Sequence, residues 1–275
     1  MNNTVTRTLS GICFLALVLG GLLINQYLYA ALLAAIIIPM MAEFYRMTLG
    51  DRYKAARILA IVLGVSLFAL VFCIFAFGIP VKYAALSAIL LLAIMVLSLF
   101  EKDRESFRQY GLIYTGLVYI ALPLSLSNIL VFDRAGNFSG LLMLSLLIII
   151  WASDVGAYCF GMMLGKNGKK LCPSISPKKS WAGFWGGLGS AVVAAVILFL
   201  TGMFPFPWWH CIGLAIVMNV MGVFGDLFES QWKRLSDVKD SGSIIPGHGG
   251  MLDRFDSAIF AIPAGVIYLI ITGLQ

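Results

Sequence analysis

The sequence predicts an all-α integral membrane protein with about nine transmembrane helices, an N-terminus in the cytoplasm and a C-terminus outside. Three observations support this fold class. The 275 residues are 61% hydrophobic and only 12% charged, which is too little polar surface for a soluble domain of this size. Apolar runs recur along the whole chain. When these runs are treated as spans, the Lys and Arg residues gather on one side of the membrane.

A helix needs about 20 largely apolar residues to cross the hydrocarbon core of a bilayer. The first run is the shortest, and we interpret it as a retained helix because no small-residue cleavage site follows it. No linker or low-complexity tract separates the runs, so we expect one membrane domain. The predicted spans are 10–25, 27–45, 57–78, 80–100, 109–131, 139–160, 182–203, 207–229 and 256–274.

The 19 Lys and Arg residues provide a separate test of this number of spans. Only Lys82 and Arg134 fall on the outer side, and all the others fall on the inner side. A missed or an extra span would move the later loops to the opposite side and destroy this segregation. The charges therefore place the loops 165–181 and 230–255 in the cytoplasm.

Residues that could take part in catalysis or bind a charged ligand are concentrated in the second half of the chain. Residues 1–138 contain apolar runs and short loops of mixed charge, and nothing in them predicts chemistry. We therefore divide the chain into N-terminal transmembrane helices, 1–138, and a catalytic transmembrane region, 139–275. The second region contains both polar cytoplasmic loops.

Two acidic positions stand out in the helices of the second region. Asp154 lies inside the sixth apolar run, where a carboxylate is costly and by default indicates function. It could instead be a structural partner for a loop lysine or a helix hydroxyl. Asp226 begins a row with Glu229, Ser230 and Lys233 at spacings i, i+3, i+4 and i+7, which is one face of a helix. This row leaves the membrane at its cytoplasmic edge.

The two loops each allow two interpretations. The five lysines of 165–181 favour either attachment to anionic lipid headgroups or a phosphate-binding surface. In the later loop, Asp253 and Asp256 could cap the last helix. Capping alone does not explain the other charged residues around them.

Glycines surround the only histidine of the later loop. Gly247, Gly249 and Gly250 flank His248, and such a turn can expose backbone N–H groups to an anion. Carboxylates at Asp154, Asp226, Asp253 and Asp256, interleaved with cations, are typical of Mg²⁺ bound together with phosphate oxygens. The residues by themselves predict a Mg²⁺ and phosphate site for phosphoryl or nucleotidyl transfer.

Residues 230–257, SQWKRLSDVKDSGSIIPGHGGMLDRFDS, resemble the signature of the phosphatidate cytidylyltransferases, or CDP-diacylglycerol synthases. Agreement at so many fixed positions is specific, unlike a single glycine motif. The segments SDVGAYCFG, SPKKSWAG and GDLFES also resemble family segments, although Ser180 replaces the usual threonine and Trp232 an aliphatic residue. The matching signature positions are Ser230, Lys233, Arg234, Lys239, Asp240, Pro246, His248, Gly249, Gly250, Asp253, Arg254 and Asp256.

The resemblance implies transfer of CMP from CTP to phosphatidate, which yields CDP-diacylglycerol and pyrophosphate in phospholipid biosynthesis. It also implies Mg²⁺ and K⁺ as cofactors, a homodimer, and a bacterial inner membrane with the active site facing the cytoplasm. The partners are then CTP, phosphatidate and the lipid bilayer, and no nucleic acid.

The resemblance also implies roles for individual residues. Asp226 and Asp253 are expected to be the principal metal ligands, with Asp256 and Asp154 beside them. The expected catalytic residues are Asp226, Asp253, Asp256, Lys239, Asp240 and His248. The expected substrate-binding residues are Ser176, Lys178, Lys179, Ser180, Ser230, Lys233, Arg234, Gly247, Gly249, Gly250 and Arg254.

Two other functions are compatible with parts of the sequence. A CTP-dependent lipid kinase of the dolichol or phytol kinase type is similarly hydrophobic, but it does not account for the 230–257 match. A cation transporter would also contain intramembrane acids. However, these acids cluster on one side, and no inverted repeat is apparent.

Overall fold

The computed structural model describes residues 3–101, 104–166, 168–247 and 249–275. Side chains are described from residue 8 onward. Eight helices in these ranges are long and apolar enough to cross a membrane, and they correspond to the second to ninth predicted spans. The first predicted span corresponds to a shorter apolar segment, Thr8–Leu23. The prediction of an all-α, multi-pass membrane protein is confirmed.

The chain forms two compact units, and both are discontinuous in sequence. The first comprises Met1–Phe138 and Ser236–Arg254, and the second comprises Ser139–Leu235 and Phe255–Gln275. Residues 236–251, called the 236–251 loop, connect the last two helices of the chain. This loop packs with the N-terminal helices. Signature residues on either side of it, Ser230, Lys233, Arg234 and Asp256, belong instead to the second unit.

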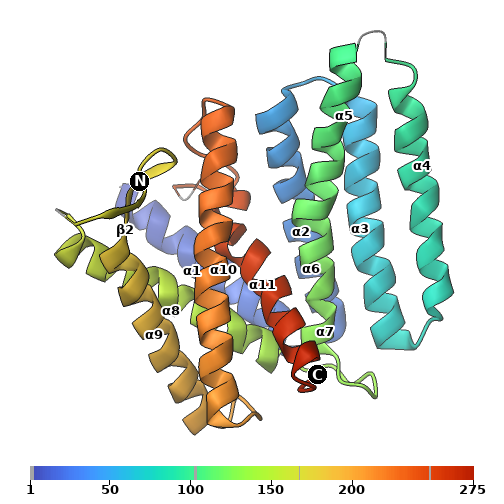
Figure 1. Cartoon of the computed structure of the whole chain (residues 1–275). Coiled ribbons are helices and arrows are strands. Elements are labelled where there is room, and N and C mark those ends of the chain that lie inside the picture. Colours follow the sequence, from blue (N-terminus) through green and yellow to red (C-terminus); the bar gives the residue numbers. More distant parts are fainter. Residues whose placement is uncertain (1–2, 102–103, 167, 248) are drawn as a thin grey trace. The chain divides into compact units, whose positions relative to one another are not determined.

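The first unit is a helical bundle in which α2, α3, α4 and α5 lie side by side (Figure 1). The helix through α5 continues as a π-helical turn and two short helices. The elements are α1 (Asn3–Leu23), α2 (Gln26–Leu49), α3 (Lys54–Phe77), η1 (Val81–Leu86), α4 (Ser87–Ser98), α5 (Arg104–Gly116), η2 (Leu117–Ala121), α6 (Leu122–Leu126) and α7 (Asn128–Val131).

The central helix of this unit is α2, which contacts α1, α3, α5 and η2. It begins after Asn25, whose side-chain oxygen accepts hydrogen bonds from the N–H groups of Tyr27 at 3.0 Å and Leu28 at 2.9 Å. It ends at Gly50, where a φ of 62° favours glycine. Both ends are therefore determined locally.

Close packing fixes α2 against its neighbours. A Cβ at Gly64 would lie 2.6 Å from the Met41 sulfur, and one at Gly116 would lie 2.5 Å from the Tyr45 ring. The Tyr45 hydroxyl also donates to the carbonyl oxygen of Ile113 at 2.8 Å. These contacts need glycine on the facing helices, because any larger residue would separate them.

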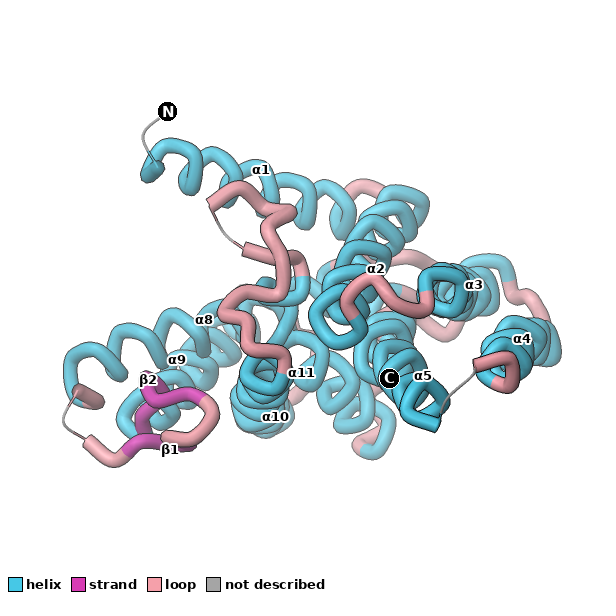
Figure 2. The backbone as a smooth tube through the Cα atoms, turned by 90° about the horizontal axis from the view of Figure 1, so that it is seen from above, coloured by secondary structure: helices cyan, strands magenta, loops and turns pink. Residues whose placement is uncertain are grey.

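The first helix is strongly inclined to the bundle. Figure 2 views α3 and α4 close to their axes, whereas α1 lies along the plane of the picture. The hydroxyl of Ser10, near the start of α1, donates to the carbonyl oxygen of Pro246 at 2.9 Å. The first helix thus reaches the 236–251 loop instead of running parallel to its neighbours.

In its described residues, the second unit contains four long helices and a small hairpin. Strands β1 and β2 pair in antiparallel fashion within the predicted 165–181 loop, with Lys170 opposite Ser180 and Cys172 opposite Ser176 (Figure 2). The elements are α8 (Leu141–Leu164), β1 (Lys170–Cys172), β2 (Ser176–Ser180), α9 (Trp181–Leu200), α10 (Trp208–Leu235) and α11 (Leu252–Ile271). The first residues of α11, up to Arg254, belong to the first unit.

We predict that Gly116→Val lowers the thermal unfolding midpoint of the detergent-solubilised protein by several degrees. The added side chain would meet the buried Tyr45 ring, and overpacking of this kind costs about 1–3 kcal/mol. The matched control is Gly111→Ala on the same helix, where an added Cβ meets nothing within 4 Å. Equal midpoints for Gly116→Val and the unmodified protein would contradict a rigid contact at Tyr45.

Candidate functional site

Acidic residues of the second unit lie where α10 meets α11. Gly225 permits the close approach, because a Cβ there would lie 2.4 Å from the carbonyl oxygen of Asp256. The rings of Phe228 and Phe260 pack beside this crossing with centroids 5.3 Å apart. Asp226 directly follows Gly225, so the crossing brings it to the turn of α11 that carries Asp256.

Four carboxylates form a group in this unit. Asp256 is close enough to Asp226, Glu229 and Asp154 for their charges to interact. Glu229 is fully buried, Asp226 and Asp256 are partly buried, and Asp154 is exposed. The group includes three of the four predicted metal ligands, and the fourth, Asp253, belongs to the first unit.

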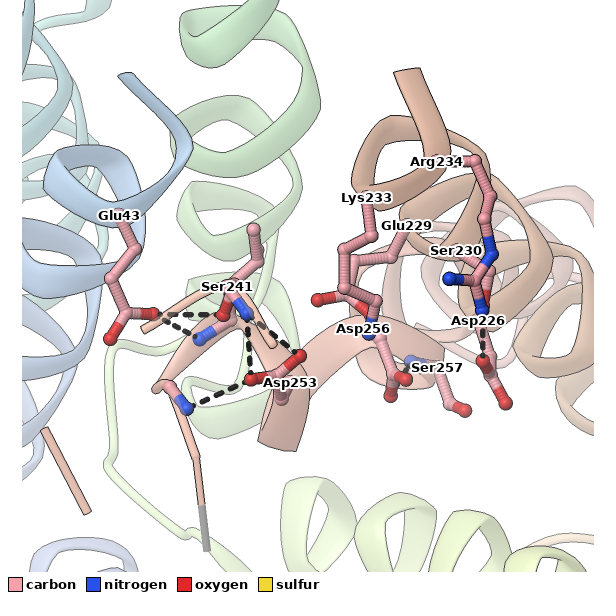
Figure 3. A network of polar contacts seen from close by, with 12 residues as sticks. Glu43, Asp226, Glu229, Ser230, Lys233, Arg234, Ser241, Asp253, Asp256 and Ser257 are labelled. Carbon is pink, nitrogen blue, oxygen red and sulfur yellow. Dashed lines mark hydrogen bonds and ion pairs between the residues drawn. The ribbon is translucent and has the colours of Figure 1, made fainter. Parts of the chain in front are cut away.

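Two lysines offset part of this negative charge. Lys179 forms an ion pair with Asp226, and Lys233 forms one with Glu229 at 2.6 Å. Figure 3 shows Glu229 and Lys233 on α10, one helical turn apart. A fully buried carboxylate requires such a partner, because an unpaired one costs several kcal/mol. Lys233, a predicted substrate-binding residue, therefore also stabilises Glu229.

The hairpin packs beside the C-terminal half of α10 and brings further cations to it. The Nε of Arg234 donates to the carbonyl oxygen of Ile175 at 3.3 Å, which ties the hairpin to the last turn of the helix. Successive side chains of a strand point to opposite faces. Accordingly, Lys179 contacts Asp226, whereas Lys178 is exposed.

The predicted serines have local structural roles. The hydroxyl oxygen of Ser180 caps α9 by accepting a hydrogen bond from Gly183 N–H at 3.2 Å. Ser176 is a partly buried residue of β2. The Ser230 hydroxyl donates to Asp226 Oδ1 at 3.4 Å (Figure 3). Their binding of substrate stays a prediction.

Asp154 follows a tight crossing of α8, α9 and α10. The Ser153 hydroxyl donates to Asn219 Oδ1 at 2.7 Å. A Cβ at Gly187 would lie 2.9 Å from the carbonyl oxygen of Ser153 and 3.2 Å from Asn219 Oδ1. Small residues thus permit close approach of three helices, as is common in membranes, and Asp154 extends from this crossing.

In the first unit, Asp253 organises the 236–251 loop. Its Oδ2 accepts hydrogen bonds from the N–H groups of Ser241 at 3.0 Å and Gly250 at 2.8 Å (Figure 3). Asp253 is the second residue of α11, and it reaches back to N–H groups before the helix, as the acid of a capping box does. The capping interpretation describes these contacts, and metal binding by Asp253 stays a prediction.

A buried glutamate of α2 holds the same loop. Glu43 is 5% exposed, and its Oε1 accepts from Met251 N–H at 3.0 Å. Its Oε2 accepts from Leu252 N–H at 2.9 Å and from the Ser241 hydroxyl at 3.2 Å (Figure 3). The first N–H groups of a helix lack partners within the helix. Glu43 supplies partners for α11 from a position 208 residues away from Met251.

Glycines of the loop are required for two different reasons. Gly247 and Gly249 have φ values of 76° and 86°, which other residues rarely adopt. At Gly250 the reason is space, because a Cβ would lie 2.2 Å from Ser241 Oγ and 2.6 Å from Glu43 Oε2. The Gly250 N–H, predicted to face phosphate, donates to Asp253 in this structure.

The other predicted residues of this segment are at the surface. Lys239, Asp240 and Arg254 have exposed side chains, as expected for groups that meet a charged ligand. His248, predicted to be catalytic, lies outside the described residues.

Sequence reasoning missed Glu43 and did not include Glu229 in the site. Glu43 is a lone carboxylate inside the second apolar run, which is the same signal that singled out Asp154. Glu229 was part of the row that begins at Asp226, but its complete burial became apparent only from the structure. Both halves of the chain therefore contain an intramembrane acid with a defined set of contacts or charges around it.

The donor set is compatible with a hard cation. Among the described residues, no three Asp, Glu, Cys or His side chains are grouped closely enough to hold a metal ion together. Mg²⁺ nevertheless needs only one or two carboxylates when phosphate and water complete its shell. Asp226 and Asp256, on touching helices, can supply them, and the ion pair with Lys179 shows that Asp226 already attracts a cation.

Comparison with known proteins identifies the family of this chain. Residues 5–272 match the cytidylyltransferase family. The phosphatidate cytidylyltransferase of Bacillus subtilis is 38% identical over 186 residues, which covers 68% of this chain and 67% of that protein. The protein of the same name from Staphylococcus aureus strain COL is 36% identical over 193 residues, covering 69% and 71%.

A third relative matches a shorter region at higher identity. The phosphatidate cytidylyltransferase of Staphylococcus saprophyticus is 44% identical over 123 residues, which covers 45% of this chain and 46% of that protein. The family match covers nearly the whole chain and includes both units. This chain therefore belongs to the cytidylyltransferase family.

Proposed function

We propose that this protein is a phosphatidate cytidylyltransferase, which transfers CMP from CTP to phosphatidate and releases pyrophosphate. The observation that carries the proposal is the group of acids on α8, α10 and α11 facing lysines from the hairpin and α10. The names of the three relatives supply the substrate class.

The reaction brings two polyanions together. The phosphate oxygen of phosphatidate attacks the α-phosphorus of CTP, and the bond from that phosphorus to the β-phosphate oxygen breaks. The electron pair leaves with pyrophosphate. The attacking monoester has a second pKa of about 6, so it is mostly dianionic at neutral pH and needs no strong base. The protein must instead align the groups and reduce their repulsion.

Cations of the second unit suit that task. Lys178 and Arg234 are exposed at the hairpin and the end of α10, so they can bind phosphate oxygens without breaking an internal ion pair with an acid. Lys179 would move from Asp226 to phosphate when that carboxylate accepts a metal ion. In the first unit, Lys239 and Arg254 are exposed, and substrate binding by them stays a prediction.

We assign Mg²⁺ to Asp226 and Asp256, with Asp154 nearby. When bound, Mg²⁺ supplies positive charge that offsets the charge of the phosphates in the transition state. The residues of this chain hold the acids in place, because Gly225 permits the helix crossing and the Ser230 hydroxyl orients Asp226. K⁺ binding and a homodimer stay predictions from the family resemblance.

We further propose that the site faces the cytoplasm of a bacterial cell, in the inner membrane. Glu43, near the C-terminal end of α2, contacts the 236–251 loop, so these two segments belong to one face of the first unit. The span count puts an even number of crossings between them, in agreement with this contact. The concentration of Lys and Arg on that face supports a cytoplasmic location.

The first prediction from this proposed function concerns the products of the reaction. Purified protein in mixed micelles with Mg²⁺, labelled CTP and phosphatidate should form CDP-diacylglycerol and pyrophosphate in equal amounts. Thin-layer chromatography and a pyrophosphate assay measure the two products. Release of free CDP with a phosphorylated lipid alcohol would indicate a lipid kinase instead. Ion flux in liposomes without turnover would indicate a transporter.

The second prediction is that Asp226→Asn lowers kcat/KM by about 100-fold or more, because a neutral amide cannot offer the same cation ligand. The matched control is Asp133→Asn, an exposed acid whose contacts are limited to its own turn at Ala135 and Asn137. The control should retain full turnover. Near-normal turnover of Asp226→Asn in Mg²⁺ would contradict the assignment of Asp226 to the metal.

The third prediction concerns orientation. In a protein that retains only Cys172, a membrane-impermeant maleimide should label inside-out vesicles and not right-side-out vesicles. Cys172 belongs to the hairpin and is partly accessible. A cysteine introduced by Lys82→Cys in the otherwise cysteine-free protein should show the opposite pattern. Labelling of Cys172 from the outer side would contradict a cytoplasmic site.

A further inference from the structure

We propose that Glu43 is a positioning residue for the reaction, which it supports by holding the 236–251 loop and the first turn of α11. This inference rests on the proposed function, because it takes the loop as part of the site. Glu43 belongs to the N-terminal helices, to which the sequence assigned no chemical role.

The first support is the set of contacts at the carboxylate. Both oxygens of Glu43 accept backbone N–H groups, from Met251 and Leu252, and Oε2 also accepts the Ser241 hydroxyl. All of these residues belong to the first unit. One side chain thereby joins the beginning of the loop to its end.

Ser241 links Glu43 to Asp253. Its hydroxyl donates to Glu43, and its N–H donates to Asp253 Oδ2 at 3.0 Å. The N–H of Gly250 donates to the same oxygen of Asp253. Two carboxylates from α2 and α11 thus hold the two ends of the loop, and a change at Glu43 should reach Asp253 through Ser241.

A second, separate support is the shape of the loop around Glu43. A Cβ at Gly242 would lie 2.4 Å from Glu43 Oε1, and a Cβ at Gly250 would lie 2.6 Å from Oε2. The backbone therefore closes around the carboxylate at two positions where no side chain fits. A side chain that served only to pack α2 against its neighbouring helices would not need the loop backbone to enclose it.

The third support is the rigidity of α2. Tyr45, two residues after Glu43, is fully buried against Gly116 and bonded to α5, and Met41 packs against Gly64. The carboxylate therefore projects from a helix that cannot shift easily. A positioning group needs such support from packed neighbours.

The contacts require a carboxylate specifically. A glutamine has the same shape but only one acceptor oxygen, and its NH₂ group would face the N–H of either Met251 or Leu252. A hydroxyl such as that of Ser241 can rotate to accept, but a backbone N–H cannot. Glu43→Gln therefore loses one of the two backbone hydrogen bonds at the start of α11 with almost no change in volume.

The test measures turnover and loop dynamics in the full-length protein. Glu43→Gln should lower kcat about 10- to 100-fold with little change in the KM for CTP, because a small misplacement of catalytic groups has an effect of this size. The matched control is Glu101→Gln in the same unit, where the carboxylate accepts a hydrogen bond from Tyr110 away from the loop. The control should keep its turnover.

Hydrogen exchange separates positioning from loss of the fold. In Glu43→Gln, peptides containing Met251 and Leu252 should exchange about tenfold faster, whereas peptides of α3 should be unchanged. Ser241→Ala should produce a smaller kcat loss, and its effect should be less than additive with Glu43→Gln, because both act on one contact.

The outcomes distinguish a positioning role of Glu43 from a general role in stability. Turnover within twofold of the unmodified protein, or a kcat loss without faster exchange of the loop peptides, would overturn the role of Glu43. Faster exchange throughout the protein would indicate a general loss of stability and would also overturn it. Turnover of the unmodified protein tests the proposed function by itself, whereas the exchange of the loop peptides tests the Glu43 contacts whatever the substrate.

Discussion

A carboxylate that is buried in a helical bundle and bonded to backbone N–H groups is the constraint on which the 236–251 loop depends. Glu43 meets the start of α11 and Ser241 at the same time, so the loop has one arrangement in which all of these donors are satisfied. Breaking one contact leaves a buried polar group without a partner, which costs about 1–3 kcal/mol. The N-terminal helices therefore provide more than a hydrophobic support.

The acids of this protein fall into two groups with different partners. Glu43 and Asp253 accept backbone N–H groups and shape the loop. Asp226 and Glu229 pair with lysines, and Asp256 shares their electrostatic environment. Acids of the first kind are already occupied by fixed donors. Acids of the second kind are paired with lysines or lie near such pairs, and among them we assign Mg²⁺ to Asp226 and Asp256.

Glycine has a consistent role in the second unit. At Gly225 it permits α11 to approach α10, and at Gly187 it permits α9 to approach Ser153 and Asn219. Lipid gives helices little hydrophobic reason to associate, so close backbone contact has to supply the packing energy. The same small residues bring Asp154, Asp226 and Asp256 into one group. The helix contacts that stabilise this unit are thus the same contacts that bring its acidic side chains together.

The sequence by itself determined the membrane class, eight of the spans and the family, because apolar length, charge segregation and fixed motif spacing are local properties of a chain. It also identified Asp226 and the hairpin lysines as candidates. Only the tertiary structure decided that Asp253 bonds to the loop backbone, that Lys179 pairs with Asp226, and that Glu43 caps α11. Contacts between residues as far apart as Glu43 and Met251 depend on how helices pack, and no pattern within either segment specifies that packing.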